Sequence, residues 1–137
     1  MPIRFSDLAN AFEFVSGGRG ENQAYVDLRT GDFHYHSDLV DTGEELPEDV
    51  DSDHYRAIPD KRDLDLGRRV ALDFAREHLG DDFGAVQAIF SRKGAYARFK
   101  DLLIRRGALD RWYEFSNAAE EAALRDWCAS EELEVID

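Results

Sequence analysis

A change of hydrophobic period along the sequence is the feature that most constrains the fold. Residues 24–29 and 33–36 alternate in polarity and are rich in aromatic and β-branched side chains, which is typical of strands. The intervening Thr30-Gly31-Asp32 forms a short turn, so the two runs predict a β-hairpin. From about residue 63 onwards, apolar side chains recur at helical spacing instead. We therefore predict an α+β fold: a small antiparallel sheet, including this hairpin at about 24–36, packed by a mainly helical C-terminal half.

A two-stranded hairpin is marginal in water, so its sheet needs further strands. The candidates are residues 55–58 and residues 133–136. A length of 137 residues predicts a single domain, residues 1–137, with one core. The helical pattern itself predicts, in order, helices at about 7–15, 63–79, 81–90 and 96–106, a short apolar segment at 109–115, and a last helix opened by an Asn117–Glu120 capping box.

The overall charge is strongly negative, with 30 acids against 17 bases and a net charge of −13. Such a balance disfavours non-specific binding to nucleic acid or to anionic membranes. No apolar stretch approaches the roughly 20 residues that cross a bilayer. The first residues lack the apolar run of a signal peptide, and Cys128 is the single cysteine. We expect a cytoplasmic protein without a membrane association.

The charges are unevenly distributed along the chain. Residues 38–53 contain eight acids and no base, and Gly43 and Pro47 disfavour regular structure there. We expect an exposed loop, because like charges in such a run repel one another. Residues 92–111, in contrast, contain seven bases and two acids on a predicted helix. This contrast is the largest charge asymmetry of the chain.

The basic stretch is the sharpest candidate for a binding site. Arg98, Lys100, Arg105 and Arg106 are the residues that we expect to meet phosphates if the protein binds nucleic acid. The competing interpretation is a solvated helix face, neutralised by Asp101, by the acidic loop or by another subunit. The apolar side of the same helix, with Tyr96, Phe99, Leu102 and Leu103, is expected in the core.

Other candidate chemistry is weaker. His34 and His36 share one face of a predicted strand, a spacing compatible with a metal ion. No second ligand pair at fixed spacing accompanies them, so exposed hairpin histidines are the favoured interpretation. Cys128 lies beside Trp127 on the apolar side of a predicted helix, where cysteine usually acts as a small apolar residue. We expect no cofactor, and the sequence singles out no catalytic residue.

Several segments together resemble uncharacterised protein family 0158, a set of small bacterial proteins. The resemblance covers roughly residues 22–128 and implies a bacterial source and one shared fold, but no activity or catalytic residue. His34 and His36 do not belong to the family's pattern. The segments that carry the resemblance are Gly94-Ala-Tyr-Ala-Arg-Phe-Lys-Asp101, Trp112-Tyr-Glu-Phe115, Ala24-Tyr-Val-Asp-Leu-Arg-Thr-Gly31, Leu46-Pro-Glu-Asp49 and Ile58-Pro59.

Three functional hypotheses follow from these observations. The first is a small, acidic, non-enzymatic binding or regulatory protein that acts through a protein partner. A homodimer is one form of it, because the helical half offers more apolar surface than a small sheet covers. The second is nucleic-acid binding through the basic helix at about 92–111. The third is an enzyme whose site matches no known motif.

Overall fold

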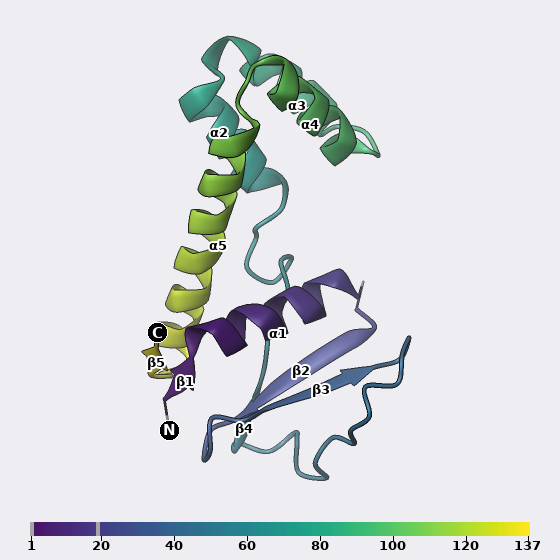
Figure 1. Cartoon of the computed structure of the whole chain (residues 1–137), viewed down its shortest axis with the longest axis vertical. Coiled ribbons are helices and arrows are strands. Elements are labelled where there is room, and N and C mark those ends of the chain that lie inside the picture. The colour runs from purple at the N-terminus through teal and green to yellow at the C-terminus, as the bar shows by residue number, and fades with distance from the viewer. Residues whose placement is uncertain (1, 19) are drawn as a thin grey trace. The chain divides into compact units, whose positions relative to one another are not determined.

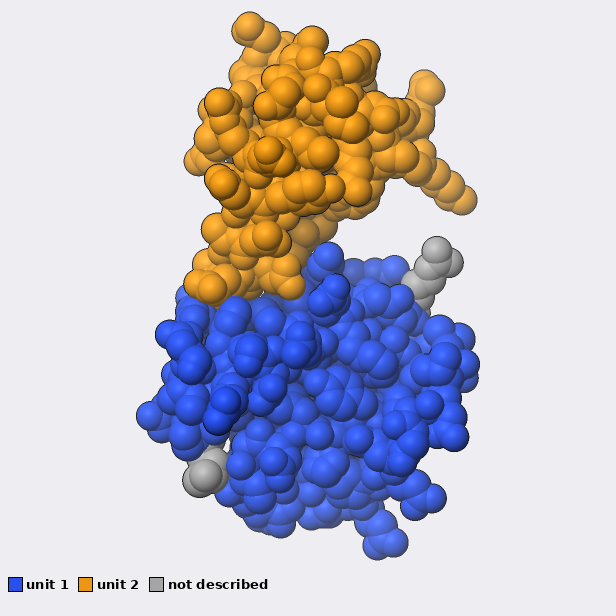
Figure 2. Space-filling model, in the orientation of Figure 1, with its two compact units in different colours: residues 1–64, 123–137 blue, residues 65–122 orange. Residues whose placement is uncertain are grey.

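The computed structural model describes residues 2–18 and 20–137 and confirms the α+β fold class (Figure 1). The chain forms two compact units, coloured separately in Figure 2. Unit 1 contains residues 1–64 and 123–137, and unit 2 contains residues 65–122. The long helix α5 (Leu109–Ser130) contributes residues to both units.

Unit 1 contains all of the strands of the described chain. They are β1 (Ile3–Arg4), β2 (Asn22–Asp27), β3 (Phe33–Ser37), β4 (Tyr55–Ala57) and β5 (Val135–Ile136), together with α1 (Phe5–Gly17). The predicted hairpin is confirmed as β2 and β3, which pair antiparallel, and β4 pairs antiparallel with the other side of β2. The sheet order is therefore β3-β2-β4.

Helix α1 covers one face of this three-stranded sheet (Figure 1). Ala24 and Val26 of β2 point to this face and are buried, as are Leu8 and Phe12 of α1. The ring of Tyr35, which is paired with Ala24, meets the ring of Phe14 edge-on at 5.1 Å. The apolar residues of β2 alternate with polar ones, which places the latter on the opposite face.

Of the two candidates for a further strand of this sheet, residues 55–58 supply β4 and residues 133–136 do not belong to it. Residues 133–136 do not join the hairpin, because β5 pairs in parallel with β1 in a separate two-stranded sheet. Glu132 adopts a positive φ of 59° after α5 and turns the chain, and the amide of Ile3 then donates to the carbonyl of Glu134 at 2.9 Å. The buried side chain of Ile3 holds this pairing against the core.

Unit 2 is helical. It contains α2 (Arg68–His78), the 3₁₀ turn η1 (Gly80–Asp82), α3 (Phe83–Ile89), α4 (Ala95–Arg105) and the first part of α5. Its core is an aromatic cluster in which Phe74 and Phe99 are fully buried and Trp112 is nearly so. The ring of Trp112 meets both phenylalanines, at 5.5 and 5.0 Å.

Two helix starts differ from the prediction. Helix α2 begins at Arg68 and not near residue 63, because Asp60 and Asp63 accept each other's backbone amides in a turn and Asp65 has a φ of 54°. Helix α5 begins at Leu109 and continues through Asn117 without a capping box. No glycine or proline interrupts residues 109–130, so a helix that starts at Leu109 extends through them.

Across the described residues, no helix is both long and apolar enough to span a membrane.

Candidate functional site

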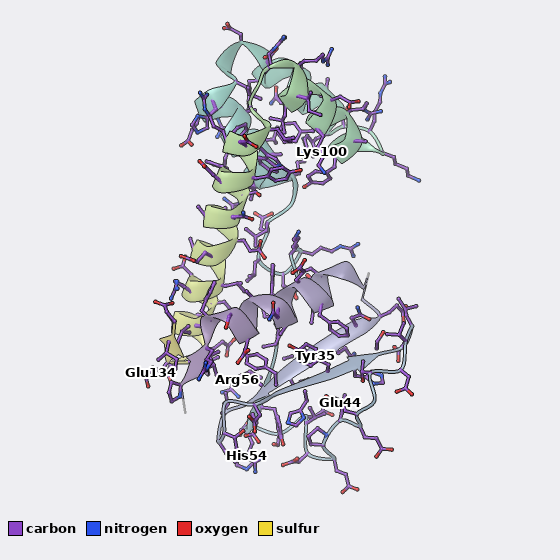
Figure 3. All side chains as sticks on the ribbon, viewed as in Figure 1. Tyr35, Glu44, His54, Arg56, Lys100 and Glu134 are labelled. Carbon is purple, nitrogen blue, oxygen red and sulfur yellow. The ribbon has the colours of Figure 1, made fainter. Side chains whose placement is uncertain are left out.

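An exposed surface of mixed apolar and basic character lies on α4 and the start of α5. It consists of Tyr96, Lys100, Ile104 and Tyr113, which we call the α4 patch. The first three are four residues apart, so they share one side of α4. Lys100 lies on α4 (Figure 3). Its Nζ is 5.8 Å from the centre of the Tyr113 ring, and this contact links α4 to α5 at the surface. The exposed fractions are 61% for Ile104, 50% for Tyr96 and 42% for Tyr113.

The α4 patch is positioned by the core beneath it. Phe99, Leu102 and Leu103 are the buried side of α4, as the sequence predicted. Tyr96, predicted in the same apolar sector, lies at its margin: one edge of its ring meets Phe90 at 5.1 Å while half of the residue stays in solvent. This partial burial raises the pKa of the Tyr96 hydroxyl.

Two of the four predicted phosphate-binding residues are engaged in holding unit 2 together. Arg98 donates to the carbonyl oxygens of Ile89 and Lys93, at 3.2 and 3.0 Å, and so fixes the connection between α3 and α4. Arg106 forms a bidentate pair with Asp82, with distances of 2.8 and 3.0 Å. The hydrogen bonds of this pair hold the pKa of Asp82 below its usual value and raise the pKa of Arg106.

The other two predicted residues are available at the surface. Lys100 belongs to the α4 patch, and Arg105 is exposed on the adjacent side of α4. Within residues 2–18 and 20–137, the Arg105 side chain makes no hydrogen bond or ion pair, and Asp101, named above as a neutralising acid, does not pair with it. The structure therefore divides the four bases into two structural and two available ones.

The predicted exposed loop, residues 38–53, is confirmed as irregular, and we call it the acidic loop. It carries two of the most exposed apolar residues, Leu39 at 67% and Val40 at 61%. The hydroxyl of the buried Ser37 accepts hydrogen bonds from both of their amides, at 3.1 and 3.3 Å, and donates to Asn22 Oδ1 at 2.5 Å. The turn that presents Leu39 and Val40 is therefore anchored to the sheet.

The acidic loop is also attached to the outer edge of β3. The carboxylate of Glu44 accepts a hydrogen bond from the Tyr35 amide at 2.6 Å, and the Thr42 hydroxyl donates to the Tyr35 carbonyl at 3.2 Å (Figure 3). These bonds satisfy backbone groups that an edge strand otherwise exposes to another chain. Leu39 and Val40 thus project from a segment that is held on both sides.

His34 and His36 lie on the sheet face opposite α1, on the same side as Tyr55. His36 Nε2 is 3.0 Å from Asp38, and His34 Nδ1 is 3.7 Å from Glu44. The described residues contain no group of three or more histidine, cysteine or carboxylate side chains arranged to hold a metal ion. Each histidine instead has a separate acidic neighbour.

Cys128 is buried, as predicted from its place on α5, and this burial raises the pKa of its thiol. A protonated, inaccessible thiol is a poor nucleophile.

Two open depressions occur in unit 2, of about 320 and 390 Å³. Arginine–aspartate pairs form part of both linings: Arg69–Asp73 in the first and Arg106–Asp82 in the second. The arginine in each of these pairs is already neutralised by its aspartate.

Comparison of the chain with protein-family models, curated proteins and solved structures gives no match. Membership of family 0158 therefore stays a prediction.

Proposed function

We propose that this chain is a small non-enzymatic binding or regulatory protein that docks a protein partner on the α4 patch. The observation that carries the proposal is the exposure of Tyr96 and Ile104 on one side of α4, with the exposed Tyr113 next to Lys100 of the same side. Tyrosine is enriched at protein interfaces because its ring buries a large apolar area while its hydroxyl keeps a hydrogen-bond partner.

The charge around the α4 patch indicates a partner segment with acidic residues. Lys100 lies within the patch and Arg105 lies beside it, and neither forms a hydrogen bond or ion pair with a carboxylate of the described chain, although the charge of Arg105 acts on Asp82 at longer range. Basic side chains at the rim of an apolar patch favour the approach of an acidic partner and disfavour a basic one. A cytoplasmic location is part of this proposal, because a buried free thiol such as Cys128 suits a reducing compartment.

Nucleic-acid binding is the alternative, and the disposition of the bases supports it less. Arg98 and Arg106 must give up their hydrogen bonds to Ile89, Lys93 and Asp82 before they meet a phosphate. The available bases lie next to the exposed Ile104, an apolar side chain that makes little favourable contact with a charged phosphate backbone.

Site-specific photocrosslinking in living cells tests the proposal. A photoreactive phenylalanine analogue replaces Ile104, and in a matched control it replaces Ala118, an exposed residue of α5 outside the patch. We expect discrete protein adducts from position 104 that are absent from position 118. Identical patterns from the two positions, or no adduct from position 104, refute the proposal, and nuclease-sensitive adducts favour the alternative.

A salt titration separates the two classes independently. Nucleic-acid binding through Lys100 and Arg105 predicts an affinity for labelled DNA or RNA that falls steeply with salt and weakens in an Arg105→Ala variant. We expect the fluorescence anisotropy of the labelled DNA or RNA to stay unchanged when the protein is added, even at low salt.

A further inference from the structure

We propose that the partner segment on the α4 patch is the acidic loop of a second copy of this chain. This inference rests on the function proposed above and names the partner. It is carried by two surfaces whose chemistry is complementary, one in each compact unit. In a twofold dimer the contact occurs twice, with each chain contributing one loop and one patch.

The acidic loop has the properties of a preorganised ligand. Leu39 and Val40 are adjacent, more than half exposed and flanked by Asp38 and Asp41. The buried Ser37 hydroxyl fixes their backbone amides. A segment that is already ordered loses less conformational entropy on docking than a flexible one does.

The far side of the turn is held as well, by the bonds from Thr42 and Glu44 to the edge of β3. The carboxylate of Asp41 accepts only the amide of Gly43 within its own turn, so its charge is not neutralised by a base of the described chain. The loop therefore presents two apolar side chains next to an available negative charge.

The α4 patch offers the matching partners. Ile104 and the rings of Tyr96 and Tyr113 provide apolar contact for Leu39 and Val40. Covering these exposed apolar side chains removes their surface from water and so stabilises the complex.

The charges match in the same arrangement. The Lys100 ammonium and the Arg105 guanidinium provide positive charge next to the apolar part of the patch, opposite the carboxylates that flank Leu39 and Val40. Because each copy carries a net charge of −13, association is opposed at long range, and the local complementarity determines which surfaces meet.

Analytical ultracentrifugation of the full chain over a wide concentration range tests the proposal. We expect the wild type to shift reversibly from monomer towards dimer as concentration rises. Leu39→Asp and Ile104→Asp each weaken dimerisation at least about tenfold, because each places a carboxylate in the apolar contact. The control Ala118→Asp adds the same charge at an exposed helical position and leaves dimerisation unchanged. Circular dichroism verifies that all three variants keep the wild-type fold.

A mixture of the two variants provides the sharper test. The Leu39→Asp chain retains an intact patch, and the Ile104→Asp chain retains an intact loop. In a dimer of either variant alone, both contacts contain a substitution. In the mixed dimer, one of the two contacts contains none. We expect the equimolar mixture to dimerise more tightly than either variant alone. A mixture no tighter than its components, or a wild type that stays monomeric throughout, overturns the inference.

The failure of this inference differs from the failure of the proposed function. A monomeric wild type that still gives a discrete adduct with another protein from position 104 rejects the second copy as partner and retains the docking surface. The absence of both dimer and adduct rejects both.

Discussion

Replacement of Phe74 tests whether the aromatic cluster is the core on which unit 2 depends. Phe74 of α2 is fully buried, and its ring meets those of Trp112 and Phe115 at 5.5 and 5.3 Å and that of His78 at 4.9 Å. Phe74→Ala removes all three ring contacts and leaves a cavity. Phe74→Leu removes the ring contacts but keeps most of the buried volume.

The magnitude follows from the buried area and the ring contacts. An aromatic side chain buries about 150–250 Å², which at about 25 cal/mol per Å² corresponds to about 4–6 kcal/mol. Alanine retains part of this, so we expect Phe74→Ala to lower the free energy of unfolding by about 3–5 kcal/mol. For Phe74→Leu we expect about 1.5–3 kcal/mol, because three ring pairs contribute roughly 0.5–1.5 kcal/mol each and the contacts of leucine recover part of this.

Urea denaturation measures these changes. Trp112 touches Phe74 and lies in unit 2, whereas Trp127 lies in the part of α5 that belongs to unit 1. In a Trp127→Phe background the fluorescence therefore reports on unit 2. Gln87→Ala, at an exposed position of α3 in unit 2, serves as the control and should change stability by less than about 0.5 kcal/mol. If Phe74→Ala costs less than about 1.5 kcal/mol, or no more than Phe74→Leu, the assignment of this cluster as the core is refuted.

Three further outcomes are expected. Gly31→Ala should cost more than about 1 kcal/mol in thermal unfolding, because φ is +80° and the added Cβ would lie 2.9 Å from the Pro2 carbonyl oxygen; an unchanged midpoint would contradict this. Asp82→Asn should destabilise the protein near neutral pH but not in acid: the folded pKa of Asp82 is depressed by Arg106, so its contribution is present above the unfolded pKa and is lost as pH falls through the folded pKa. Urea midpoints at several pH values check this, and a difference that persists in acid would count against it. The Cys128 thiol should react slowly with Ellman's reagent until denaturant is added, and rapid reaction of the native protein would show that it is accessible.

The elements that the sequence predicted well are those with a strong local signal. The alternating runs around Thr30-Gly31-Asp32 became the β2–β3 hairpin, and the apolar stripe of Phe99, Leu102 and Leu103 became the buried side of α4. In these segments the turn chemistry and the hydrophobic period agree with the final packing. A local pattern is sufficient to predict the structure in such cases.

The errors arose where tertiary context decides between local alternatives. Asn117 with Glu120 satisfies the capping-box pattern, but the helix that begins at Leu109 already supplies the backbone bonds that a new cap would make. Residues 133–136 had a strand pattern, and the pattern does not state which edge they join. The pairing with β1 depends on the position of Ile3, which is distant in sequence.

The candidate site shows the same division. The sequence predicted the position of α4 correctly, but it did not indicate which of the basic side chains are already hydrogen-bonded. The partners of Arg98 and Arg106 are carbonyl oxygens and a carboxylate outside α4. Neither Tyr113 nor Leu39 was predicted as a binding residue. Exposure of an apolar side chain is a tertiary property, although an apolar pair between two aspartates, as at Leu39 and Val40, was a visible signal.

The number of bases in residues 92–111 therefore overstates what α4 offers to a polyanion. A phosphate backbone attracts a protein in proportion to the cations that are free to approach it. Engagement of Arg98 and Arg106 in hydrogen bonds within unit 2 lowers that number, and the available bases stand next to Ile104 and two tyrosines. Such a surface gains most from a ligand that brings apolar side chains and carboxylates together. A polypeptide segment provides both. A nucleic acid provides negative charge and bases that stack on tyrosine rings, but it offers little to cover the aliphatic side chain of Ile104.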